Sequence, residues 1–202
     1  MRKGMLILFG LLFASITPAQ TRLEVKDLQN HPFTVPFAAE NRLSVHLQGG
    51  DFRIIGIDED RIVVHFIGAN AGQARNLTVR LTENDKGNEL RIFHGPRNDL
   101  QVTVEIPTHT DLYVRMSGGD LNLVHVIGNK DVSLVGGDLK IDAGNPSDYA
   151  RVSASVRFGD VYAPDFGESK GWMGGSINTT GPGKYTLHAH VFAGDLTLHS
   201  SR

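Results

Sequence analysis

Three histidines near the C-terminus have the side chains and the spacing to bind a metal ion. His188 and His190 lie two residues apart in an alternating segment, so both imidazoles face the same side of a predicted strand. Such a pair can bind zinc or copper, and His199, expected outward on a neighbouring strand, could add a third ligand. The alternative is an ordinary polar strand face. Because the spacing guarantees no nearby carboxylate, we expect no metal site and keep these histidines only as weak candidates.

A Gly-Asp pair followed by an apolar residue recurs along the chain and could place carboxylates in a cation-binding ladder. Calcium-binding repeats, however, carry further glycines and aspartates inside each turn, whereas an apolar residue follows directly here. Glycine tolerates positive φ, and aspartate can accept a hydrogen bond from a backbone N–H two residues on. We therefore expect structural corners at Gly50-Asp51, Gly119-Asp120, Gly137-Asp138, Gly159-Asp160 and Gly194-Asp195, and at a degenerate copy, Gly175-Ser176.

Trp172 is the only tryptophan, and it lies in a glycine-rich segment, residues 167–175. On a loop it could stack on a sugar ring or anchor a protein partner. The alternative, which we favour, is that Trp172 folds over and shields the core. The serines lack the Gly-x-Ser-x-Gly setting of a nucleophile. We expect no catalytic residue, no cofactor and no enzymatic activity.

The spacing of the Gly-Asp copies predicts the elements that position them. From the second copy onward the aspartate of each copy, or the serine of the degenerate one, stands at residue 120, 138, 160, 176 and 195. The intervals between copies are therefore 18, 22, 16 and 19 residues. Between copies, apolar and polar residues alternate with the period of a strand. This pattern predicts an all-β fold, a single-stranded β-solenoid or β-helix-like stack of short strands with Gly-Asp corners. We expect one dry column of side chains from Leu121, Leu139, Val161, Ile177 and Leu196.

The sequence pattern of the N-terminal part of the chain predicts strands with less regular spacing. Five strands are expected between the first two Gly-Asp copies, at residues 62–67, 77–81, 90–94, 100–106 and 112–116. A β-sandwich-like meander is the alternative architecture. Residues 20–41, with Pro32 and Pro36, are expected to form a tether or an irregular first strand. The solenoid-like domain is then residues 42–202.

Residues 1–19 have the features of a cleaved signal peptide. Arg2 and Lys3 precede a short apolar run, and Ala19 offers a cleavage site. Cleavage removes two of the 20 basic residues and none of the 22 acidic ones, so the net charge becomes −4. This charge argues against nucleic acid as a partner, and we expect no stable membrane insertion after leader removal. The chain has no cysteine, which excludes disulfides and lipid attachment at a cysteine.

Residues 102–107, VTVEIP, and residues 111–123, DLYVRMSGGDLNL, resemble a known pattern. A strand ends in Ile-Pro, a turn follows, and the next strand runs into Ser-Gly-Gly-Asp. This pattern is similar to that of the bacterial putative-adhesin family of unknown function, related to auto-transporter adhesin head domains. The resemblance covers residues 42–198 and departs at Gly175-Ser176. It implies a β-solenoid-like fold, a bacterial source and an envelope or secreted location, and it supplies no catalytic residues.

Together these features predict a non-enzymatic exported interaction, adhesin-like or scaffold module of the bacterial cell envelope. Its location would be the periplasm, the cell surface or outside the cell, and its partner an envelope protein or glycan. Residues 196–199 are expected to form an exposed C-terminal edge strand, through which the protein could self-associate. The alternative function is a carbohydrate-active β-helix that binds or cleaves a polysaccharide, for which two carboxylates should converge in a cleft.

Overall fold

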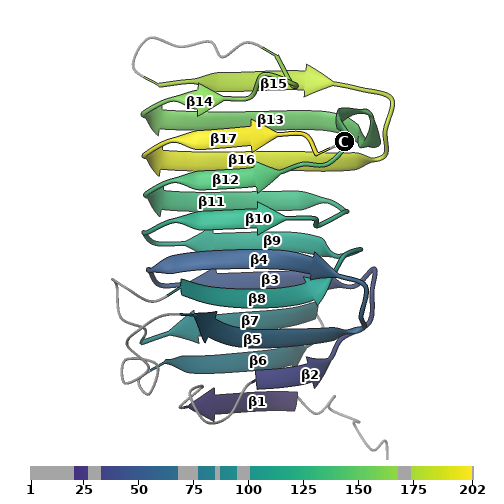
Figure 1. Cartoon of the computed structure of the whole chain (residues 1–202), viewed down its shortest axis with the longest axis vertical. Coiled ribbons are helices and arrows are strands. Elements are labelled where there is room, and N and C mark those ends of the chain that lie inside the picture. The colour runs from purple at the N-terminus through teal and green to yellow at the C-terminus, as the bar shows by residue number, and fades with distance from the viewer. Residues whose placement is uncertain are drawn as a thin grey trace, which may run out of the picture.

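The computed structural model describes residues 21–26, 33–67, 77–84, 87–94, 101–167 and 174–201. Apart from a short 3-10 turn, η2 (Pro146–Asp148), every element in these residues is a strand, so the predicted all-β class is confirmed. The strands form two sheets (Figure 1). The expected strands between the first two Gly-Asp copies all occur, with ends shifted by a few residues.

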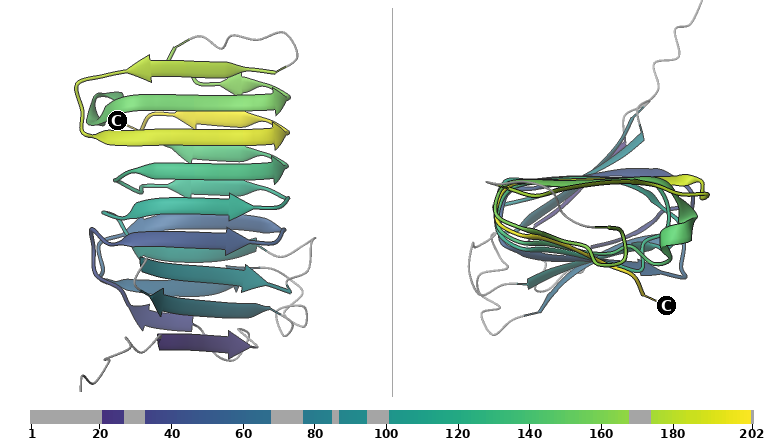
Figure 2. Two further views of the ribbon diagram at one scale, coloured as in Figure 1. Left: turned by 180° about the vertical axis from the view of Figure 1, so that it is seen from behind. Right: turned by 90° about the horizontal axis from the view of Figure 1, so that it is seen from above.

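The nine-stranded sheet contains, in spatial order, β1 (Thr21–Lys26), β6 (Thr78–Asn84), β7 (Gly87–Phe93), β3 (Arg42–Leu47), β9 (Asp111–Met116), β11 (Lys130–Gly136), β16 (Tyr185–Ala193), β13 (Tyr149–Phe158) and β15 (Ser176–Thr180). The eight-stranded sheet contains, in spatial order, β14 (Val161–Tyr162), β17 (Leu196–His199), β12 (Leu139–Asp142), β10 (Leu121–Val124), β4 (Asp51–Ile57), β8 (Gln101–Pro107), β5 (Arg61–Ile67) and β2 (Phe33–Pro36). Figure 1 shows the eight-stranded sheet in front, and Figure 2 shows the nine-stranded sheet from behind.

Consecutive strands alternate between the two sheets through most of the molecule. In five pairs of consecutive strands the first strand lies in the nine-stranded sheet and the second in the eight-stranded sheet. These pairs are β3–β4, β9–β10, β11–β12, β13–β14 and β16–β17. Within each sheet these strands pair in parallel. Figure 2 shows the two sheets facing each other across a flattened interior when seen from above. Two facing sheets are also compatible with the sandwich-like alternative, and the solenoid interpretation remains a proposal.

The expected dry column exists for four of its five residues. Leu121 pairs in register with Leu139, Leu139 with Leu196, and Leu196 with Val161, and all four side chains are buried. Phe52 extends the column on the other side of Leu121. The fifth residue was placed wrongly, because Ile177 lies on β15 in the other sheet, opposite Ala154.

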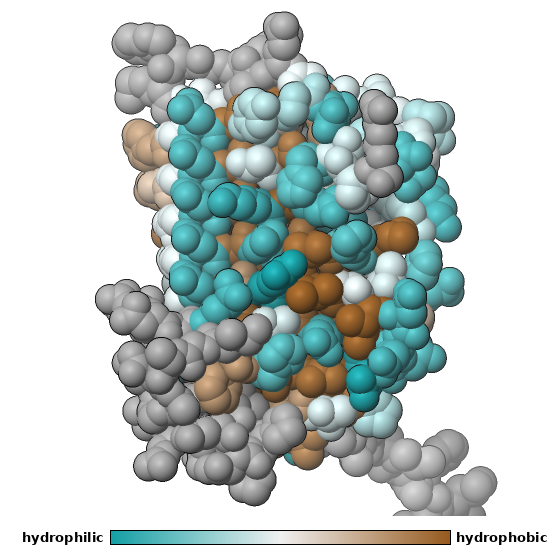
Figure 3. Space-filling view, in the orientation of Figure 1, coloured by the Kyte–Doolittle hydropathy of each residue, from teal (hydrophilic) through white to brown (hydrophobic). Residues whose placement is uncertain are grey.

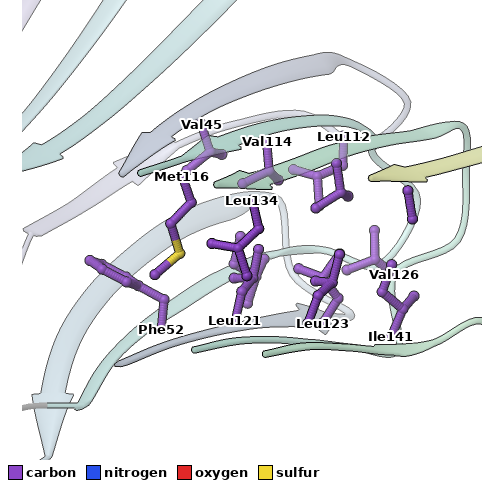
Figure 4. Close-up of a cluster of buried hydrophobic side chains, with 14 of the residues drawn as sticks. Val45, Phe52, Leu112, Val114, Met116, Leu121, Leu123, Val126, Leu134 and Ile141 are labelled. Carbon is purple, nitrogen blue, oxygen red and sulfur yellow. The ribbon is translucent and has the colours of Figure 1, made fainter. Parts of the chain in front are cut away.

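The core fills the space between the two sheets. Figure 4 shows Val45, Val114 and Leu134 from the nine-stranded sheet pointing toward Leu121 and Leu123 from the eight-stranded sheet. These five side chains are at most 1% exposed. Since burying an aliphatic side chain of this size stabilises a fold by about 1.5–3 kcal/mol, the repeated inward positions hold the stack together. Period-two alternation thus sets which side chains face the core.

The N-terminal part is less regular, as expected, because it contains four antiparallel strand pairs. β1 pairs antiparallel with β6, β6 with β7, β2 with β5, and β5 with β8. The region expected to be a tether or irregular first strand therefore holds two paired strands. β2 also contributes to the core, since Phe33 is 1% exposed and Val35 is buried. Residues 33–36 thus pack with the domain that was predicted to begin at residue 42.

The predicted C-terminal edge strand is wrong. β17 lies inside the eight-stranded sheet, with β12 on one side and β14 on the other. Likewise β16 lies between β11 and β13. The last strand pair of the chain is thus inserted between two earlier pairs, and Leu196 and Thr197 have a paired strand on each side. Among the described strands, β14 and β15 form that end of the stack (Figure 1).

The predicted signal peptide, residues 1–19, lies outside the described residues. Within the described part of the chain, no helix has the length and apolar character needed to cross a membrane.

Candidate functional site

The Gly-Asp corners lie one above another along one side of the stack. Gly50, Gly119, Gly137, Gly159 and Gly194 all have positive φ, between 91° and 133°. A Cβ atom on Gly137 would lie 2.1 Å from the carbonyl oxygen of Gly119, and one on Gly194 would lie 2.0 Å from that of Gly137. Glycine is therefore required both by the backbone conformation and by the close approach of the next corner.

Three of the five corner aspartates accept hydrogen bonds across the stack rather than within their own turn. Asp120 accepts a hydrogen bond from the N–H of Asp138 (3.1 Å), Asp138 from that of Asp195 (3.2 Å), and Asp195 from that of Asp160 (2.9 Å). The expected bond to an N–H two residues on is thus replaced by a bond to the next corner. This ladder gives the carboxylates a structural role that needs no cation.

The degenerate copy, Gly175-Ser176, does not form a corner of this kind. Ser176 begins β15, which pairs antiparallel with β13, and Ser176 lies opposite Ser155.

Trp172 lies outside the described residues, so the choice between its two predicted roles stays open.

The three candidate histidines are not brought together. His188 and His190 lie on the outward face of β16, as predicted, with His188 3.4 Å from an Asp131 oxygen and His190 3.0 Å from the Ser155 hydroxyl. His199 lies on β17 in the other sheet. Its expected place on a neighbouring strand is wrong because β16 and β17 belong to opposite sheets. No group of three or more histidine, aspartate or glutamate side chains in the described residues could hold a metal ion.

A cavity of about 510 Å³ opens on the side opposite the Gly-Asp corners, next to η2. We call it the η2 cavity. Its lining is rich in groups that exchange hydrogen bonds: Asp58, His125, Asp142, Asn145, Asp148, Tyr149, Tyr185 and Ser201. Sequence reasoning missed this site, since its residues come from strand ends and turns between Gly56 and Ser201 that lie far apart in the sequence.

A buried lysine supports one wall of the η2 cavity. Lys130 is 1% exposed, and its Nζ donates to the Tyr149 hydroxyl (2.7 Å) and to the Gly128 carbonyl (3.3 Å). The Tyr149 hydroxyl in turn donates to the Ala143 carbonyl (2.8 Å). A signal for this residue existed in the sequence, because Lys130 stands two residues before Val132, in the inward phase of the alternation.

Burial and hydrogen bonds shift the pKa values of three groups in and beside the η2 cavity. Burial lowers the pKa of Lys130 to about 8 and raises the pKa of Tyr149. Burial also raises the pKa of Asp142, but hydrogen bonds from Ser201 and the Gly144 N–H outweigh it, and the net pKa is lowered. At neutral pH Asp142 is thus an ionised acceptor, while the protonated Tyr149 hydroxyl already donates to the Ala143 carbonyl. A general acid would need the opposite shift at the carboxyl.

A second hollow, of about 420 Å³, lies on the outward face of the nine-stranded sheet. We call it the arginine groove. Strand register places Arg80, Arg91, His46 and Arg115 in one outward row on β6, β7, β3 and β9. Neighbouring strands lie about 4.8 Å apart, so the row presents a basic side chain on each of four successive strands.

Comparison with known proteins gives one informative likeness. The crystal structure of a putative cell adhesion protein from Clostridium sporogenes is similar, with a TM-score of 0.50, 15% sequence identity, and coverage of 92% of this chain and 100% of that chain. At this identity the likeness shows a shared fold. A putative lipid binding protein from Parabacteroides distasonis has 7% identity, a TM-score of 0.18, and coverage of 85% of this chain and 96% of that one, and it carries no argument. No family model and no curated protein matches the sequence.

Proposed function

We propose that the protein is a non-enzymatic, exported β-solenoid that serves as an adhesin-like interaction or scaffold module of the bacterial cell envelope. The alternation of consecutive strands between two parallel-paired sheets supports the solenoid, since each strand pair then corresponds to one coil. The leader-like residues 1–19 support export to the periplasm, the cell surface or the medium. The likeness to a protein named for cell adhesion supports the role.

One observation carries the proposed binding role. The outward residues of the nine-stranded sheet stand in register across many strands, as in the row Thr82, Glu89, Ser44, Tyr113, Asp131, His188, Ser153, Asn178. Such a face is long, regular and polar, with polar and charged side chains repeating at the strand spacing. An envelope protein or a glycan with a similar repeat can contact this face over several strands.

A binding assay with the purified protein tests this role. Fluorescently labelled protein is incubated with whole cells and with isolated envelopes of the bacterium that makes it, and retention is measured after washing. We expect saturable retention that excess unlabelled protein competes away. Retention no greater than that of an unrelated β protein of similar charge would overturn the proposal. N-terminal sequencing of the exported protein, expected to start at Gln20, tests its location independently.

A carbohydrate-active protein is the second candidate, and the η2 cavity favours it. Asp58, Asp142 and Asp148 line one space, as carboxylates do in glycoside-cleaving sites. Incubation with a panel of polysaccharides, followed by measurement of new reducing ends, separates the two functions. We expect no new ends. Turnover that is lost in Asp142→Asn and kept in Lys140→Gln, an exposed change two residues away, would establish cleavage instead.

A further inference from the structure

The arginine groove is lined by cationic groups without a carboxylate. Arg80, Arg91 and Arg115 contribute guanidinium groups, and His46 an imidazole. Their acidic neighbours do not line the groove: Arg80 pairs with Glu24 (3.0 Å), Arg91 with Glu89, and Arg115 with Asp131 (3.0 Å). The hollow therefore gathers N–H donors of three guanidinium groups whose carboxylate partners lie outside its lining, and this arrangement points to a site for an anion.

The existing ion pairs leave most donors for a ligand on Arg91. Arg115 has fewer to offer, since its Nη1 donates to the Val114 and Asp131 carbonyls and its Nη2 pairs with the Asp131 carboxylate. Arg91 uses its Nε toward Glu89, and among the described residues no other protein group accepts from its two terminal nitrogens. The Arg91 side chain is 53% exposed, while those of Arg80 and Arg115 are 27% and 32% exposed. A guanidinium carries five N–H donors in a fixed fork that matches an oxyanion. Arg91 can thus bind an anion while Glu89 holds the side chain in place.

Aromatic rings hold the neighbouring arginines and add an apolar contact. The Arg80 guanidinium lies 4.9 Å from the centre of the Phe93 ring, and that of Arg115 lies 3.6 Å from the centre of the Tyr113 ring. Phe93 and Val135 also line the groove. Apolar side chains next to a row of cations suit a ligand that has both C–H faces and acidic groups, which is the chemistry of an acidic sugar.

We propose that the arginine groove binds an oxyanion-bearing polysaccharide, with the acidic groups on Arg91 and Arg115 and the chain running across the strands from β6 to β9. This inference rests on the proposed function and names the class of its partner. A carboxylate and a sulfate ester present the same chemistry to a guanidinium, so either can be the acidic group.

His46 provides a second observable in the same groove. Burial lowers the pKa of His46, and the charges of Arg91 and Arg115 lower it further, while Glu89 raises it. The imidazole Nε2 lies 3.5 Å from a Glu89 oxygen. An anion bound beside it offsets the two guanidinium charges, and where this outweighs the added burial we expect binding to raise the pKa of His46. By linkage, the ligand then binds more tightly as the pH falls through the His46 titration.

Isothermal titration of the purified protein with four polymers tests the proposal. Polygalacturonate carries carboxylates and dextran sulfate carries sulfate esters, while fully methyl-esterified polygalacturonate and plain dextran are their neutral counterparts. We expect one or both anionic polymers to bind and neither neutral one. Arg91→Gln and Arg115→Gln should each weaken binding about tenfold, because each removes a charge-assisted hydrogen bond. The matched control is Arg53→Gln, an exposed arginine on the outward face of β4 in the other sheet.

Each outcome decides the matter. Binding lost in the two groove variants and kept in the control, with the His46 ring titration moved to higher pH by the polymer, supports the site. No binding of either anionic polymer, or equal weakening by Arg53→Gln, overturns it. Equal binding of polyglutamate or single-stranded DNA would show a general anion surface and overturn the polysaccharide assignment. Retention on envelopes that persists in the Arg91→Gln variant would leave the proposed function standing while removing this site.

Discussion

At the scale of single residues, Lys130 is a charge held inside an apolar stack. Its place in β11 follows from the same alternation that buries Val132 and Leu134. Its ammonium is stabilised in part by the hydrogen bonds that it donates to the Tyr149 hydroxyl and the Gly128 carbonyl. Nearby Asp142, Asp111 and Asp148 favour the charged form, but burial dominates and lowers the pKa to about 8. The residue thus joins the core to the wall of the η2 cavity.

The lowered pKa of Lys130 makes stability depend on pH in a defined window. Below pH 8 the lysine is charged in both folded and unfolded chains, and its burial penalty is fully present. Between pH 8 and 10.5 the unfolded chain holds more protons, so the free energy of unfolding rises with pH, by up to about 3 kcal/mol. Urea denaturation at pH 7 and pH 10 measures this rise, and Lys130→Met should abolish it. An equal rise in that variant would assign the effect to another group.

The Asp ladder is the second residue-scale device, and it predicts a graded pair of variants. Asp195→Ala removes the acceptor of the Asp160 N–H and should cost about 1 kcal/mol of unfolding free energy. Asp195→Asn keeps a carbonyl oxygen at the same place and should cost less than half of that. Thermal denaturation with and without 5 mM calcium completes the test. A calcium-dependent rise of the melting temperature, lost in both variants, would favour the cation ladder instead.

At the scale of elements, the Gly-Asp corners allow consecutive coils to approach at strand spacing. Gly137→Ala should destabilise the protein in two ways, because the residue has a φ of 117° and its new Cβ would lie 2.1 Å from the Gly119 carbonyl oxygen. Gly167 is a matched control, with a φ of 125° and no atom within 4 Å of a built Cβ. We expect Gly137→Ala to cost about 1–3 kcal/mol more than Gly167→Ala in denaturant unfolding. Equal costs would show that backbone conformation alone requires glycine there.

The elements themselves could be predicted from sequence because strands and corners are local. Alternation placed β5 to β9 and β17 within a few residues, and the Gly-Asp copies marked five true corners. The partner of each strand is not local. Leu139 can stack on Leu196 or on Val161 with the same register, and nothing in a period of about 20 residues distinguishes them. The same holds for the η2 cavity and the arginine groove, which are assembled by strand pairing.

At the scale of the whole molecule, the chain order and the stacking order differ. The strand pair β16–β17 comes last in the sequence but lies between β11–β12 and β13–β14 in the stack (Figure 1). β13 has no parallel partner until β16 has arrived. The strands β13, β14 and β15 therefore depend on the last residues of the chain for their place in the stack. The strands β3, β4, β9 and β10 pair with one another without those residues.

Hydrophobic side chains also lie between polar ones on the outer surface of the eight-stranded sheet, as Figure 3 shows. Ile55, Val63 and Val124 are partly buried on that face. The nine-stranded sheet also exposes apolar side chains, among them Val135 and Phe192, so it is the row of arginines that places the proposed polysaccharide contact there.

Deleting Thr197–Arg202 tests how far the inserted strand pair holds the upper stack. The deletion removes most of β17, including Leu198, which is fully buried. Since a buried leucine contributes about 2–5 kcal/mol, the truncated chain should lose amide protection in β13, β14 and β15 and keep it in β3, β4, β9 and β10. Hydrogen exchange followed by mass spectrometry measures both regions in one experiment. The control is Thr197→Ala with His199→Ala, which changes outward side chains and keeps the strand.

Uniform loss of protection would mean that the stack unfolds as one unit. Full protection in β13 would mean that it pairs elsewhere when β17 is absent, and either result would contradict the dependence argued here.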